Sequence, residues 1–113
     1  MPSDKRLTVA FYRTVAGSEP VREWLKDLAP EDRRRVGEDL QALEFGWPLG
    51  MPLCHSLGNG LWEVRSSISD RRIARVIFCI AYERMVLLHA FIKKTQKTPK
   101  RDIDLALKRK KGE

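Results

Sequence analysis

The sequence predicts an α+β domain whose helices pack on a small antiparallel sheet. Three apolar segments between Leu61 and Ile92 are separated by Ser67–Arg71 and by Glu83-Arg84. Connections this short produce antiparallel hairpins, because a parallel crossover needs a dozen or more residues. One strand and two helices are predicted before these segments, and one helix after them. The order is therefore β-α-α-β-β-β-α, with the first two helices forming a hairpin that packs on one face of the sheet.

The N-terminal strand and the first helix are predicted from their residue patterns. Leu7–Tyr12 is rich in β-favouring residues, with Val9 and Phe11 on one face. Ser18-Glu19-Pro20 has the capping hydroxyl and the early proline of a helix start. The helix that follows has an apolar stripe with i, i+3, i+4, i+7 spacing, which consists of Val21, Trp24, Leu25 and Leu28. We expect this stripe to be buried.

A second helix is predicted from about Pro30 to Phe45. Its apolar side consists of Val36, Leu40 and Leu43. The run Arg33–Arg35 on this helix could indicate nucleic-acid binding, but acidic residues lie one turn away on both sides. The opposite charges four residues apart are Glu31–Arg35, Arg34–Glu38 and Arg35–Asp39. We therefore interpret the arginine run as a solvated helical face.

The rest of the chain is predicted to contain a loop, three strands and a helix. Glycines and prolines punctuate Gly46–Gly60, which is expected to be an ordered loop over the core. The last of the three strands is apolar on both faces from Met85 to Ile92, so we expect it to be central and covered on both sides. Thr98-Pro99 is again a capping hydroxyl followed by proline. The helix after it has a narrow apolar stripe of Ile103, Ala106 and Leu107.

Length and composition indicate a single domain over residues 1–113. No apolar run approaches the roughly 18 residues that cross a bilayer, and the N-terminus lacks the apolar core of a signal peptide. We therefore expect a cytoplasmic protein that makes no membrane contact. The two cysteines, Cys54 and Cys79, are too few for a disulfide framework. Cys54-His55 has no second Cys/His cluster to complete four ligands, so neither a metal nor another cofactor is expected.

The positive charge of the chain is concentrated near its C-terminus. The net charge is +7, and residues 93–113 hold nine Lys/Arg against three Asp/Glu, a net of +6. Residues 1–92 hold thirteen against twelve. A localised basic patch favours a polyanionic partner. The alternative is a solvated helix face followed by a frayed tail, and charge alone does not decide between the two.

Two arginines in the predicted hairpin are the first candidates for chemistry. Arg65 lies in LWEVRS and Arg75 in RIARVIF, on neighbouring strands. An arginine within an apolar run is costly to bury and needs a compensating interaction. The structural explanation for one arginine is a pair with Glu63 or another carboxylate. Two such arginines beside Lys93, Lys94 and Lys97, with one acid nearby, favour an anion site.

If the anion is RNA, guanidinium groups can hold phosphate with two parallel hydrogen bonds and lysines can add point charges. Cleavage without a metal uses the ribose 2′-OH as nucleophile and needs a base, an acid and cations around the phosphate. Arginine is too basic to be the base, whereas a lysine crowded by cations could share in proton transfer. His89 is the residue type suited to neutral pH. Its position in MVLLHAF also fits a core histidine hydrogen bonded to a polar neighbour.

These residues also resemble a known family. The succession GLWEVRS, IARVIF and LLHAFIKKTQKTP before a final helix is similar to the phage-derived, HigB-like branch of the RelE/ParE toxin superfamily. FIKKTQKTP is the most specific part, and FGWPLGMPL supports it. The resemblance implies a RelE-like sheet related to microbial RNases. It also implies a type II toxin–antitoxin toxin that cleaves mRNA in the ribosomal A site and is neutralised by an adjacently encoded helix-turn-helix antitoxin.

The resemblance also implies roles for particular residues. Arg65 corresponds to a basic residue on the first strand of the hairpin, and Arg75 to an arginine that contacts the scissile phosphate. Lys93 and Lys94 correspond to a basic pair after the last strand. The expected catalytic set is Arg65, Arg75, Lys93, Lys94 and His89, with Lys97, Lys100 and Arg101 binding RNA. RelE-type toxins often have a C-terminal tyrosine, and this chain has no aromatic residue after Phe91.

Two alternatives to an mRNA endonuclease remain. A ParE-like inhibitor of DNA gyrase would share the fold but have another target. A basic module that binds RNA or a partner protein without catalysis would need the cations but no proton-transfer group.

Overall fold

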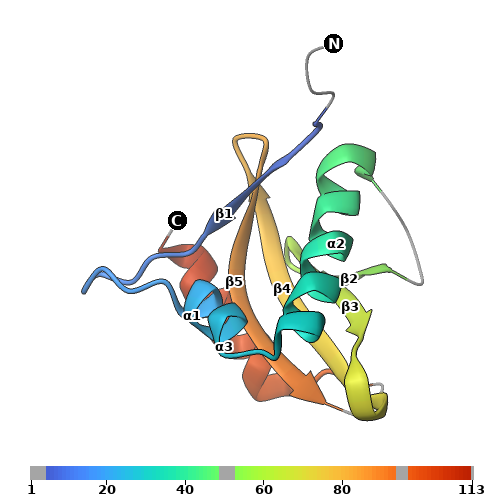
Figure 1. Ribbon diagram of the computed structural model, residues 1–113. Helices are drawn as coiled ribbons and strands as arrows, with labels where there is room; N and C mark the ends of the chain where they lie inside the picture. Colours follow the sequence, from blue (N-terminus) through green and yellow to red (C-terminus); the bar gives the residue numbers. More distant parts are fainter. Residues whose placement is uncertain (1–4, 49–52, 94–96, 113) are drawn as a thin grey trace.

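The computed structural model describes residues 5–48, 53–93 and 97–112. It has the α+β fold that the sequence predicts, with one strand and a helical hairpin before the central strands and one helix after them (Figure 1). Among these residues, no helix is long and apolar enough to cross a membrane. The elements are β1 (Thr8–Phe11), α1 (Pro20–Lys26), α2 (Pro30–Gly46), β2 (Cys54–Gly58), β3 (Leu61–Ser67), a 3₁₀ turn (Ser69–Arg71), β4 (Ile73–Ala81), β5 (Arg84–Lys93) and α3 (Lys100–Lys111).

The sheet has five strands in the order β1-β5-β4-β3-β2. As predicted, β3, β4 and β5 are joined by antiparallel hairpins, and β5 is an interior strand. The sheet differs from the prediction in two respects. The segment expected to be a loop contains β2, which pairs antiparallel with β3, and β1 pairs parallel with β5. The sheet is therefore mixed.

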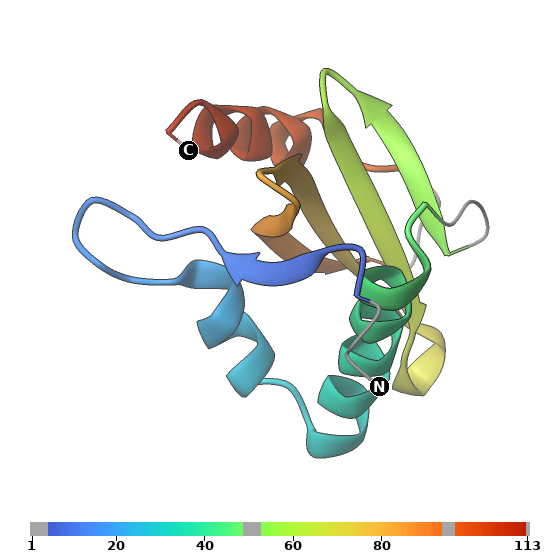
Figure 2. The same cartoon turned by 90° about the horizontal axis from the view of Figure 1, so that it is seen from above.

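The helical hairpin of α1 and α2 covers one face of the sheet (Figures 1 and 2). Its predicted stripes are buried there: Val36 and Leu43 have no exposed surface, and Val21 is almost as well covered. They pack against strand residues that point to this side, which include Val64, Val76, Phe78, Met85 and Leu87. At roughly 1.5–3 kcal/mol for each fully buried aliphatic side chain, this core is the main stabilising contribution on this face.

The opposite face is covered by α3, so the sheet lies between two helical layers (Figure 2). Ala106 is fully buried in this second core, and Ile103 and Leu107 pack beside it as the predicted stripe requires. The strand residues on this side are Leu61, Ile77, Cys79, Val86 and Leu88. The alternation of apolar residues to both faces of β4 and β5 is the sequence signature of this arrangement.

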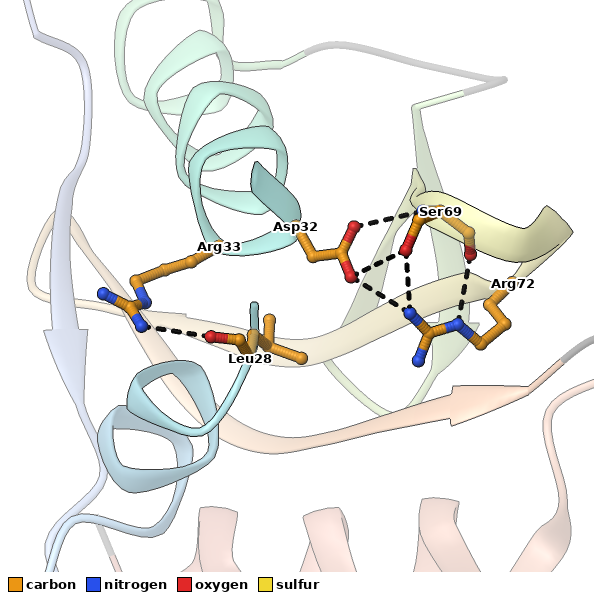
Figure 3. A network of polar contacts seen from close by, with 5 residues as sticks. All are labelled: Leu28, Asp32, Arg33, Ser69 and Arg72. Carbon is orange, nitrogen blue, oxygen red and sulfur yellow. Dashed lines mark hydrogen bonds and ion pairs between the residues drawn. The ribbon is translucent and has the colours of Figure 1, made fainter. Parts of the chain in front are cut away.

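A polar network fastens α2 to the connection between β3 and β4 (Figure 3). The Asp32 carboxylate, in the first turn of α2, accepts hydrogen bonds from the backbone N–H of Ser69 at 3.1 Å and from its hydroxyl at 3.0 Å. It also accepts one from Arg72 Nη2 at 3.0 Å. These bonds, the backbone bond first among them, lower the pKa of Asp32 below its ordinary value, although burial opposes them. The carboxylate is therefore held ionised against the sheet.

Arg33 lies next to Asp32 and is exposed, as predicted, but its guanidinium is also hydrogen bonded to the preceding helix. Its Nε donates to the Leu25 carbonyl at 3.1 Å, and its Nη2 donates to the Lys26 carbonyl at 3.1 Å. Its Nη2 also donates to the Leu28 carbonyl at 3.0 Å (Figure 3). A cation is favoured at these carbonyls because they form the negative end of the helix dipole of α1. Arg33 thus caps α1 from the next helix, which a sequence count of i, i+4 pairs does not reveal.

Candidate functional site

Strand pairing brings the predicted site residues together on the α3 face of the sheet. Arg65 in β3 lies opposite Arg75 in β4, and Arg75 lies opposite Phe91 in β5. The next row on this face joins Ser67, Ile73 and Lys93. Directly paired residues share a face, so charged side chains from three adjacent strands point to one side. This agrees with the expectation that the hairpin arginines and Lys93 are neighbours.

At the centre of this face is a buried carboxylate that both arginines contact. Glu63 has no exposed surface, and its Oε1 accepts a hydrogen bond from Arg65 Nε at 2.7 Å. Arg75 Nη1 lies 3.5 Å from the same oxygen. Thr98, two residues before α3, donates its hydroxyl to Glu63 Oε2 at 2.5 Å. We call Glu63, Arg65, Arg75 and Thr98 the Glu63 cluster.

Arg75 is, like Glu63, a fully buried member of the Glu63 cluster. Its side chain is 0% exposed. Burial is the main influence on the guanidinium and lowers its pKa; the Glu63 carboxylate raises the pKa and the positive charge of Arg65 lowers it. Arginine remains protonated under all these influences, because its ordinary pKa lies far above neutral. A buried charge of this kind depends on its partner, so Glu63 and Arg75 form an interdependent pair.

The Glu63 cluster gives Arg65 and Arg75 different roles, whereas the sequence predicted that both contact the phosphate. The sequence left pairing with Glu63 open as the explanation for a single arginine, and in the structure Glu63 contacts both. Arg75 has no exposed surface in this conformation, so a phosphate cannot reach it from solvent. Arg65 is different, because 20% of its side chain is exposed at the edge of the cluster. The geometry therefore offers Arg65 for contact with a ligand and Arg75 for positioning Glu63.

Thr98 also has a role different from the one predicted. The sequence marks it as a helix cap, but α3 begins at Lys100 with Pro99 at its N-cap and without a side-chain capping bond. The buried Thr98 hydroxyl instead completes the hydrogen bonding of Glu63. The signal for the cluster was present in LWEVRS, since alternate residues of a strand share a face and Glu63 and Arg65 are two apart. Nothing in the sequence indicated that Thr98 joins them.

His89 lies on the same face and is hydrogen bonded to α3. Its Nε2 is 2.7 Å from Asp102 Oδ1, and its ring stacks on Phe91 with centroids 5.4 Å apart. The His89 side chain is 16% exposed and that of Asp102 is 13% exposed. A register shift in the pairing of β4 with β5 leaves Leu88 as an extra residue, a β-bulge that turns both Leu88 and His89 toward α3. Sequence reasoning did not identify Asp102 as the partner.

The remaining predicted residues lie around this face. Lys93 is half-buried at the end of β5, and Lys94 lies outside the described residues. Lys97, Lys100 and Arg101 are exposed, and Lys100 Nζ is 2.9 Å from Asp104 Oδ2 in a solvent-exposed pair. These three residues surround the start of α3. They add positive charge next to the Glu63 cluster without contacting it through any ion pair among the described residues.

The fold and the site define a class of protein. A five-stranded mixed sheet with a helical hairpin on one face and a charged cluster under a C-terminal helix on the other is a small α+β fold of RelE-like type. The model of the family described as "Phage derived protein Gp49-like (DUF891)" matches residues 23–111, and the chain belongs to this family. The match runs from α1 to the end of α3 and includes the whole Glu63 cluster. A search of curated proteins found no match.

Proposed function

We propose that this chain is the toxin of a type II toxin–antitoxin pair, of the HigB-like branch, and that it cleaves mRNA on the ribosome without a metal. The observation that carries the proposal is the Glu63 cluster, in which a buried carboxylate holds Arg65 at a partly exposed edge of the sheet. Membership of the Gp49-like family, which is known as a RelE-like toxin family, supports a toxin role. The proposed partners are a helix-turn-helix antitoxin and mRNA in the ribosomal A site, both in the cytoplasm.

In the proposed reaction, the ribose 2′-oxygen attacks the adjacent phosphorus. The 2′-hydroxyl gives up its proton to a base as the new 2′-O–P bond forms, and the 5′-oxygen takes up a proton as its bond to phosphorus breaks, which leaves a 2′,3′-cyclic phosphate and a 5′-hydroxyl. Arg65 and the lysines that follow β5 would stabilise the charge that develops on the phosphate oxygens. A guanidinium already oriented by Glu63 does this at low reorganisation cost, because the protein holds it in place before the substrate arrives.

His89 is the proposed proton-transfer residue. Its hydrogen bond to Asp102 fixes the ring orientation and keeps Nε2 occupied, so a proton would be exchanged with substrate at Nδ1. This pairing of a histidine with a carboxylate is a common way to orient a general base or acid.

The test is induced expression in cells followed by primer extension on abundant transcripts. We expect growth arrest and new 5′ ends within codons for the natural chain. Arg65→Ala and Lys94→Ala should abolish both effects, and His89→Gln should reduce cleavage by at least about 10²-fold if it transfers a proton. Arg34→Ala, an exposed change of equal charge on α2, is the matched control and should arrest growth normally.

Growth arrest without new 5′ ends would contradict the nuclease proposal. In that case, inhibition of supercoiling by stoichiometric protein added to purified gyrase would favour the ParE-like alternative. A second candidate function is binding to RNA without cleavage, and the complete burial of Arg75 favours it over direct catalysis by that residue. It predicts that purified protein protects bound RNA, and that His89→Gln leaves growth arrest unchanged.

A further inference from the structure

The cleft between α2 and the end of β3 has the features of an anion site that is separate from the Glu63 cluster. We propose that it binds a second phosphate group of the same RNA strand. This inference rests on the proposed RNA-binding function. It extends that function by placing part of the RNA strand beyond the edge of the β-sheet, against α2. The cleft has a volume of about 220 Å³ and is lined by Arg35, Asp39, Leu53, Arg65, Ser67 and Ile73.

The cleft lies beside the end of β3 that extends past the described pairing with β2. Cys54, the first residue of β2, lies opposite Val64, and the backbone N–H of Arg65 donates to the Leu53 carbonyl at 3.1 Å. Ser67 at the end of β3 pairs with Ile73 of β4, and both residues line the cleft together with residues of α2. A volume of this size is smaller than the roughly 300–1,000 Å³ of drug-sized ligand pockets and suits a single charged group rather than a base or a cofactor.

Cations from two elements line this opening, and a third lies one strand away. Arg35 comes from α2 and Arg65 from β3, and both line the cleft. Ile73, which also lines the cleft, lies directly opposite Lys93 of β5, which places the lysine one strand away. Asp39 is the one acid in the lining, so the local balance is positive. Two arginines that line one small cleft from different elements supply the side chains that bind phosphate most readily.

The ion pair that Arg35 makes is weak enough to be exchanged for a ligand. Arg35 Nε lies 3.7 Å from Asp39 Oδ2, beyond hydrogen-bond range, and 55% of the arginine side chain is exposed. Exposed pairs of this kind contribute little to stability. The other two pairs predicted for this helix, Glu31–Arg35 and Arg34–Glu38, are absent from the structure of α2, in which all four residues are described. Arg35 therefore lines the cleft while it makes only a weak ion pair with Asp39.

Arg65 links the cleft to the Glu63 cluster. Its Nε donates to Glu63 Oε1, and the same residue lines the cleft. Successive phosphates of an extended strand could therefore be held by Lys93 and Arg65 on the sheet face and by Arg65 and Arg35 at its edge. This arrangement gives the arginine run of α2 a partial role in RNA binding: Arg35 takes part, Arg33 caps α1, and Arg34 does not line the cleft.

The experiment compares two substitutions of equal charge on adjacent residues. Binding of a fluorescently labelled, uncleavable 2′-O-methyl oligonucleotide is measured by anisotropy over a series of KCl concentrations for the natural full-length chain, Arg35→Ala and Arg34→Ala. We expect Arg35→Ala to weaken binding about tenfold at low salt and to reduce the slope of log K against log[salt] by about 0.7, the value for one phosphate contact on a single strand. Arg34→Ala should change binding less than about twofold and leave the slope unchanged.

A third variant tests whether removing a negative charge from the cleft raises the affinity for RNA. Asp39→Asn removes the acid that opposes an anion in the cleft, so it should tighten binding. Equal effects of Arg35→Ala and Arg34→Ala, with an unchanged slope for both, would overturn the second phosphate site while leaving RNA binding intact. Absence of binding by the natural chain at every salt concentration would instead overturn the proposed function, and the second site with it. Circular dichroism of each variant checks that the fold is retained.

Discussion

At the scale of single residues, the Glu63 carboxylate is the common partner of the charged and polar side chains on the α3 face of the sheet. It contacts two guanidiniums and one hydroxyl while fully buried. A charge buried in this way is tolerated because each neighbour compensates for part of its lost hydration. The same contacts fix the guanidinium of Arg65, which the proposed function requires. Stability and function therefore depend on one side chain.

Replacing Glu63 should destabilise the whole protein. Glu63→Gln keeps the volume but leaves the Arg75 charge buried without its carboxylate, a loss of about 3–5 kcal/mol in the free energy of unfolding. Urea denaturation measures this directly. Thr98→Val is the matched change, since it removes one hydrogen bond to the same carboxylate and should cost about 1 kcal/mol. A Glu63→Gln variant as stable as the natural chain would show that the buried pair contributes nothing.

The candidate site could be predicted from the sequence only in part, and the reason is visible in these residues. Arginines inside apolar runs identify Arg65 and Arg75 as residues that need partners, and alternation along a strand places them on one face. How one carboxylate is shared between them depends on strand register and on the approach of Thr98 from beyond β5. Those are tertiary contacts, and local patterns do not encode them. Asp102 escaped prediction for the same reason.

At the scale of elements, the connection between β3 and β4 is held in an uncommon conformation. Asp70 and Arg71 have φ angles of 60° and 59°, in the left-handed region that residues with a Cβ rarely adopt. The Asp32 network lies directly beside them, with Ser69 before the pair and Arg72 after it (Figure 3). We infer that Asp32 compensates for the backbone strain of this turn by binding the residues on both sides of it.

This inference predicts a pH-dependent effect of Asp32→Asn. The folded pKa of Asp32 is depressed, so the stability it provides is present above the unfolded pKa, near 4, and is lost as pH falls through the folded pKa. The variant should melt several degrees below the natural chain at pH 7, and the difference should narrow below about pH 4. Melting temperatures across pH 2–7 check this. Asp27→Asn, an exposed change of equal charge at the C-cap of α1, should show no such convergence.

The elements predicted from periodicity are confirmed, and those missed lacked a periodic signal. The apolar stripes of α1, α2 and α3 and the apolar runs of the three hairpin strands are local sequence patterns, so they can be recognised without knowledge of the tertiary structure. By contrast, β2 reads CHSLG, a short segment that ends in glycine, and it becomes a strand because it pairs with the edge of β3. The parallel pairing of β1 also could not be read from loop lengths, because its connection to β5 runs through most of the chain. Short-loop reasoning applies only to consecutive strands.

At the scale of the whole molecule, two hydrophobic cores share one sheet, and the charged face lies on the side of the sheet that α3 covers. The helical hairpin covers one side and α3 the other, while both cores draw their residues from the same strands. Because α3 carries Asp102 and follows Thr98, its docking also positions the charged face. If the two layers unfolded independently, the site could be lost while the rest of the protein stayed folded. If they unfold together, the site is as stable as the protein.

Two neighbouring leucines in β5 distinguish these cases. Leu87 points into the core under the helical hairpin and Leu88 into the core under α3, and both are fully buried. Leu87→Ala and Leu88→Ala should each lower the free energy of unfolding by about 2–5 kcal/mol, because each leaves a cavity. Urea unfolding followed by circular dichroism and by tryptophan fluorescence should give one coincident transition for both variants, with an unchanged m value. A separate early transition in Leu88→Ala alone would show instead that α3 detaches first, and that the charged face is held less firmly than the sheet beneath it.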